Sequence, residues 1–234
     1  MNNTTLNLLA VSVFALTLLS LVGPLLNISP GAIAVVITGC AGAIALDRLS
    51  WQGKGANLLL DIVSSQSSGY RQRIIHHEAG HFLVAHLLEI PVESYTLSAW
   101  EGLKAGLPGL GGVIVASNPT AAELLSEQQV NRYCTLWMAG IAAEMQTFGT
   151  AHGGDDDKRQ LQRLWQQARL VGVPTARAQA VDSQLRWALL QAQTLIEQHQ
   201  KAYCALVEAM TNRHSVDICI QHIEANRSDS APNP

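Results

Sequence analysis

The strongest chemical signal in the sequence is the motif His77-Glu78-Ala79-Gly80-His81, which has the form H-E-x-x-H. Residues four apart in a helix lie on the same face, so the two imidazoles could hold one zinc ion. Glu78 follows the first histidine, where it can accept a proton from zinc-bound water and generate the hydroxide that attacks a peptide carbonyl. A structural zinc site has no need of this carboxylate, so the motif favours hydrolysis.

A catalytic zinc needs a third protein ligand and an open position for water. A third histidine of the metzincin kind is excluded, because Leu87 stands at that position and His86 lies off the ligand face of the helix. A following helix offers Glu123 and Glu144 instead. The turn at residues 153–157 offers three aspartates, but acidic side chains at this place also cap a helix and suit its dipole. From their spacing alone, these aspartates could be either metal ligands or helix caps.

The motif lies on a predicted helix at residues 71–88, whose apolar residues recur at helical spacing. Two strand-like runs follow, at 92–97 and 112–117, separated by a glycine-rich loop at 102–111, and they predict a small antiparallel pair. Further helices are expected at about 121–148, 158–170 and 175–213, the last as one helix or as two pieces. The predicted fold class is mainly α with a small β-sheet.

The first 46 residues contain no Lys, Arg, Asp or Glu. This composition predicts two apolar spans, at 6–26 and 32–46, that form a transmembrane hairpin. A cleaved signal peptide is disfavoured, because the N-terminus has no basic residue. Arg48 and Lys54 follow the second span and place the rest of the chain on the cytoplasmic side. We therefore expect a multi-pass integral membrane protein with the lipid bilayer as a partner.

Composition divides the chain into four parts. These are a hairpin at 1–47, a Gly- and Ser-containing linker at 48–69, a peptidase domain at 70–225 and a polar tail at 226–234 that we expect to be disordered. The four cysteines form no C-x-x-C pair and are expected to be reduced thiols. The net charge of -3 gives no indication of a nucleic-acid partner.

Three segments together resemble the peptidase domain of the FtsH family of membrane-bound, ATP-dependent zinc proteases. The sequence at 77–81 matches that family's H-E-A-G-H, including the two middle residues. The segment 139–144 is similar to its A-G-R-x-A-E, with Ile141 in place of the arginine. Residues 152–157 fall where the family has a T-G-A-x-N-D turn, whose final aspartate is the third zinc ligand. The likeness covers about residues 70–224.

The resemblance implies a zincin-like helical peptidase domain that uses Zn²⁺ to cleave a protein or peptide substrate. It assigns the third ligand to Asp157, with Asp156 as a substitute, and gives Glu144 the task of orienting a ligand. His152 could approach the substrate, whereas His76 is only a neighbour of the motif. A ring-shaped homo-oligomer is also implied.

One departure from the family is large, since the sequence contains no G-x-x-x-x-G-K-[ST] phosphate-binding loop. The expected activity is therefore that of a zinc metalloendopeptidase without its own ATPase, acting alone or with an ATPase partner in trans. The alternative is a non-catalytic membrane scaffold or partner subunit with a structural zinc site.

Overall fold

The computed structural model describes residues 3–26, 29–50, 68–104, 112–116 and 126–227. The chain divides into two compact units, each described here by itself. The first comprises Met1–Tyr70 and Ser98–Leu110, and the second comprises Arg71–Leu97 and Gly111–Pro234. Most of the predicted linker, the C-terminal tail from residue 228 and Glu123 lie outside the described residues.

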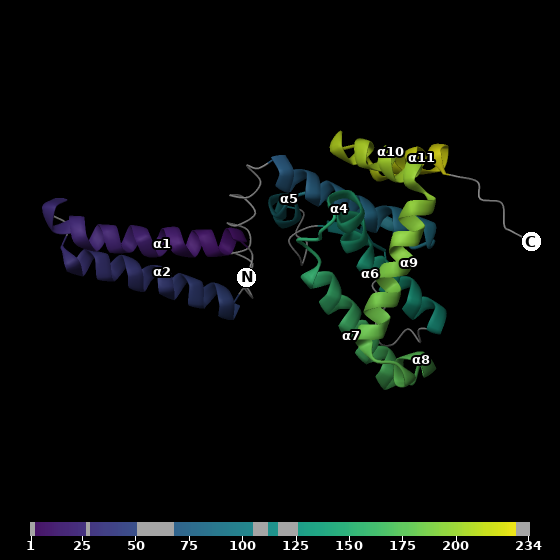
Figure 1. The fold of residues 1–234 in the computed structure, drawn as a ribbon, viewed down its shortest axis with the longest axis horizontal. Helices are drawn as coiled ribbons and strands as arrows, with labels where there is room; N and C mark the ends of the chain where they lie inside the picture. Colours follow the sequence, from purple (N-terminus) through teal and green to yellow (C-terminus); the bar gives the residue numbers. More distant parts are fainter. Residues whose placement is uncertain (1–2, 27–28, 51–67, 105–111, 117–125, 228–234) are drawn as a thin grey trace, which may run out of the picture. The chain divides into compact units, whose positions relative to one another are not determined.

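The described residues of the first unit include two long helices, one short helix and a 3-10 turn (Figure 1). They are α1 (Asn3–Val22), η1 (Gly23–Leu26), α2 (Pro30–Ser50) and α5 (Ala99–Lys104). Ser29 caps α2, since its Oγ accepts a hydrogen bond from the Ala32 amide at 3.2 Å. Pro30 suits the first helical position because no amide is needed there.

The predicted transmembrane hairpin is wrong, and so is the multi-pass membrane localisation inferred from it. Within the described ranges, no helix meets both the length and the apolar character that a membrane span requires. A crossing takes about 20 predominantly apolar residues. The 20 residues of α1 begin with Asn3, Thr4 and Thr5, and α2 includes Asp47 and Arg48 before it ends.

The second unit is built from helices and one small sheet. Its helices are α4 (Ser68–Leu87, belonging to this unit from Arg71), α6 (Glu127–Phe148), α7 (Asp155–Val171), α8 (Pro174–Ala178), α9 (Val181–Gln198), α10 (Gln200–Thr211) and α11 (Val216–Asn226). Strands β1 (Val92–Thr96) and β2 (Gly112–Val115) pair antiparallel, with Tyr95 opposite Val113. A mainly helical fold with a small antiparallel pair is thus confirmed.

Two differences from the predicted helices have local causes. The segment 175–213, expected as one helix or two pieces, forms three helices, because Gln179 and Ala180 are extended and His199 has non-helical dihedral angles. Helix α11 was not expected from the sequence. Arg213 takes a left-handed φ of 60° after α10, and the His214 amide donates to the Ala209 carbonyl, which turns the chain into α11.

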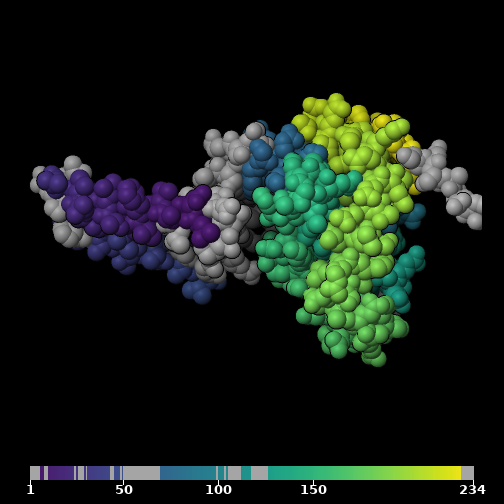
Figure 2. Space-filling model, in the orientation of Figure 1, coloured from purple at the N-terminus to yellow at the C-terminus, as the bar shows by residue number. Residues whose placement is uncertain are grey.

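Two large apolar clusters and a small one around Ile90 hold the second unit together. One large cluster gathers buried residues of α4, α10 and α11, and the other large cluster joins α6 to α7 and α9. In Figure 2, α9 runs along one face of this unit in light green, with α10 in yellow at its end. Helix α4 contacts α6 so closely that a methyl group on Gly80 would lie 2.5 Å from the Ala139 carbonyl oxygen. This close approach brings the histidine face of α4 against α6.

Candidate metal centre

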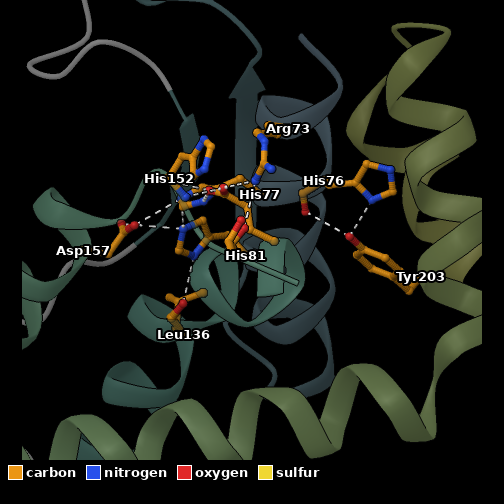
Figure 3. A network of polar contacts seen from close by, with 11 residues as sticks. Arg73, His76, His77, His81, Leu136, His152, Asp157 and Tyr203 are labelled. Atoms are coloured by element: carbon orange, nitrogen blue, oxygen red, sulfur yellow. Dashed lines mark hydrogen bonds and ion pairs between the residues drawn. The ribbon is translucent and has the colours of Figure 1, made fainter. Parts of the chain in front are cut away.

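His77 and His81 project from one face of α4 toward Asp157 on the first turn of α7 (Figure 3). The two Nε2 atoms are 3.1 Å apart, and Nε2 of His77 is 3.1 Å from Oδ2 of Asp157. Nε2 of His81 is 3.6 Å from Oδ1 of the same carboxylate. Ligand atoms on a tetrahedral ion with bonds of about 2.0–2.1 Å are separated by about 3.3–3.4 Å. The two Nε2 atoms, and each Nε2 with its nearer carboxylate oxygen, are therefore separated by about the distance expected between ligands of one zinc ion.

The second nitrogen of each ring fixes how the histidines face the site. Nδ1 of His77 lies 2.8 Å from Oε1 of Glu144, and Nδ1 of His81 lies 2.8 Å from the carbonyl oxygen of Leu136. A carboxylate and a carbonyl only accept hydrogen bonds, so each ring donates its Nδ1–H. Both Nε2 atoms then face each other and the carboxylate of Asp157, an arrangement that fits a bound cation.

The electrostatics of this cluster also stabilise positive charge. Burial by itself lowers the pKa of His77, but hydrogen bonds with Asp157 and Glu144 outweigh burial and raise the pKa to about 10. Burial raises the pKa of Asp157, yet His81 and His77 reverse this effect and hold it well below its usual range. Asp157 is thus an ionised carboxylate, the form that binds metal.

Glu78 is half-buried on α4 and is held by the sheet. Its Oε2 accepts a hydrogen bond from the Val113 amide of β2 at 3.0 Å. Gly112 has a φ of +123°, and a methyl group there would lie 3.3 Å from the same oxygen, so glycine suits this position. Burial raises the pKa of Glu78, an effect that His77 and His81 partly offset. A carboxylate with a raised pKa is suited to accept a proton.

One face of α6 supports the histidines through Leu136, Gly140 and Glu144, which recur every four residues. A methyl group on Gly140 would lie 2.5 Å from Cε1 of His77 and 2.5 Å from Nε2 of His81, so only glycine lets the rings approach α6. Leu136 and Gly140 were missed as functional positions. Their i, i+4 spacing with Glu144 is the signal that could have found them.

The three aspartates of the predicted turn take different positions. The N-cap residue of α7 is Gly154, which has a φ of +93°. The N-terminus of α7 has no side-chain capping hydrogen bond, so none of the aspartates acts as the cap. A side chain on Gly154 would overlap Ile141, which packs beneath the turn. Asp156 is exposed and pairs with Arg159 at 2.6 Å, away from the histidines. The structure brings Asp157 alone of the three to the site.

The other candidate residues are placed around this centre. Glu144 is buried behind His77, whose Nδ1 it contacts, and it accepts a hydrogen bond from the amide of His152 at 2.8 Å. The side chain of His152 is exposed above the rings (Figure 3). His76 contacts Tyr203 through Nδ1 at 2.8 Å, and His86 pairs with a glutamate of α11, so neither faces the donor atoms.

Arg73 is a further residue that sequence reasoning missed. It lies four residues before His77 on the same face of α4, and its guanidinium contacts Glu144 at 3.3 Å. Its i, i+4 spacing from His77 was the available signal.

No protein-family model matches the sequence, and a search of the curated proteins found no match. The case for a function therefore depends on the chemistry of the described residues.

Proposed function

We propose that this chain is a zinc metalloendopeptidase, which hydrolyses peptide bonds in protein or peptide substrates without an ATPase of its own. The observation that carries the proposal is the convergence of His77, His81 and Asp157: the two Nε2 atoms are 3.1 Å apart, and they lie 3.1 Å and 3.6 Å from the two oxygens of the carboxylate. The bonds to Glu144 and Leu136 leave both Nε2 atoms free to bind metal.

The ligand types support zinc. Two imidazoles and one carboxylate are a combination found in catalytic zinc sites, which use three protein ligands and keep a fourth position open. A structural site is usually closed by four ligands. Among the described residues, three side chains gather at this centre, which favours a catalytic site over a structural one.

Bound zinc would supply a Lewis acid that polarises the peptide carbonyl and lowers the pKa of water at the site. Glu78 would take the proton from the attacking water and pass it to the amine nitrogen that leaves. Its raised pKa and its fixed position against the Val113 amide support this role. Removing a general base typically lowers the rate by about 10²- to 10⁴-fold.

The test measures zinc content and cleavage of an unfolded protein such as casein, using the full chain. We expect stoichiometric zinc in the wild type, a large loss in Asp157→Ala and no loss in Asp156→Ala, since Asp156 is exposed and pairs with Arg159. Glu78→Gln should retain zinc and lose cleavage.

Each contrary outcome has a definite meaning. Wild-type protein that binds no zinc would refute the metal centre. Zinc binding without cleavage would indicate a structural zinc site, and cleavage by Glu78→Gln at the wild-type rate would refute the role of Glu78.

A further inference from the structure

Arg73 connects three segments that carry the metal centre. Its Nη1 lies 3.3 Å from Oε2 of Glu144 on α6 and 2.8 Å from the carbonyl oxygen of Thr150. Thr150 belongs to the turn between α6 and α7, which leads directly to Asp157. One guanidinium of α4 is therefore tied to the residue that holds His77 and to the segment that presents the third ligand.

The carboxylate of Glu144 depends on this guanidinium. Glu144 is 3% exposed, and each of its oxygens has two donors. Oε1 contacts Nδ1 of His77 and the amide of Gly153, whereas Oε2 contacts Arg73 and the amide of His152. A histidine that binds metal is neutral, so it donates a hydrogen bond to Glu144 but no charge. Arg73 then supplies the positive charge that a buried carboxylate requires.

The guanidinium is itself held in place. It lies over the ring of Phe148, with 4.4 Å between the central carbon and the ring centroid, and the side chain is 21% exposed. Stacking on an aromatic face restrains the guanidinium plane. A lysine could supply the charge, but its compact ammonium lacks the planar fork and would stack less well. Both features of Arg73, its charge and its shape, are therefore used.

We propose that Arg73 is a positioning residue, which holds Glu144 and the turn after α6 so that His77 and Asp157 present their donor atoms to the metal. The inference rests on the zinc site proposed above. It predicts that Arg73 controls metal affinity without touching the metal.

The test measures zinc affinity of the full chain by competition with a fluorescent chelator. Groups that hydrogen-bond to a metal ligand, as Glu144 does to His77, typically contribute 10- to 100-fold to metal affinity. Because Arg73 acts through Glu144, we expect Arg73→Gln to bind zinc about 10-fold more weakly, the lower end of that range, and Arg73→Lys, which keeps the charge, to bind with an affinity between those of Arg73→Gln and the wild type. Arg71→Gln is the matched control, because Arg71 is exposed on the same helix, and its affinity should equal that of the wild type.

A second readout separates positioning from general loss of structure. Cobalt(II) bound in place of zinc absorbs visible light according to its ligand geometry, so its spectrum should change in both Arg73 variants and not in Arg71→Gln. Circular dichroism of metal-free Arg73→Lys should match the wild type, and this variant tests the inference should Arg73→Gln not fold.

The inference is overturned if the wild type binds zinc and the folded Arg73 variants bind it equally well with the same cobalt spectrum. Wild-type protein that binds no zinc overturns the metal centre itself, and the inference with it.

Discussion

Replacing Gly140 by alanine adds one methyl group against both histidines of the metal centre. In the structure that carbon would lie 2.5 Å from Cε1 of His77 and 2.5 Å from Nε2 of His81. Ordinary contacts of a Cβ atom begin at about 3.4 Å. The rings would therefore have to withdraw from α6 by about 1 Å, because the methyl group is fixed to the helix backbone.

A displacement of this size is large compared with the tolerance of metal coordination, in which ligand distances stay within about 0.2 Å of their usual values. We expect Gly140→Ala to weaken zinc binding by at least about 100-fold, equivalent to about 2.7 kcal/mol. The effect on folding should be smaller. Overpacking costs about 1–3 kcal/mol, and alanine regains about 1 kcal/mol as a better helix former than glycine.

The assay is a chelator competition that gives the zinc dissociation constant, with urea unfolding of the metal-free protein as the measure of stability. Gly39→Ala is the matched control, because Gly39 is also helical and a methyl group there meets nothing within 4 Å. Gly140→Ala protein that folds and binds zinc with wild-type affinity would refute the placement of His77 and His81 against α6.

Four further outcomes follow from the structure. Zinc at 1,000 times its dissociation constant should stabilise the wild type by about 4 kcal/mol, measured by urea unfolding, and a chelator should reverse this, whereas Asp157→Ala should show no gain. Leu161→Ala, at a fully buried position of α7, should lower the free energy of unfolding by about 2–5 kcal/mol. Leu170→Ala, on the exposed side of the same helix, should change it by less than about 0.5 kcal/mol. Equal losses in the two variants would contradict the described packing of α7. Burial raises the pKa of the Cys134 thiol to about 12, so iodoacetamide at pH 8 should label exposed Cys204 far faster. Because that pKa is raised in the folded state, the Cys134 contribution to stability is complete below about pH 8.5 and is lost as the pH rises toward 12, which denaturation at several pH values would detect.

The sequence predicted the elements whose signals are local. Apolar residues at helical spacing predicted the helix that carries the histidines. Strand-like runs on either side of a glycine-rich loop predicted both strands. The breaks at Ala180 and His199 carry no Gly or Pro, so nothing local marked them. The apolar N-terminal segment led to a membrane prediction that the described helices do not support.

The metal centre also combines a feature that local sequence predicts with one that depends on tertiary packing. The sequence by itself put His77 and His81 on one face of a helix, because the pitch of an α-helix fixes which residues share a face. Asp157 is 80 residues from His77, and Glu144 is 67 residues from it, so residue spacing left the aspartates of the turn open as ligands. The family resemblance favoured Asp157, and the packing of α6 and α7 against α4 brings it, and not Asp156, to the histidines. Contacts between distant segments depend on the direction in which each helix enters the core. That direction is a property of the assembled fold.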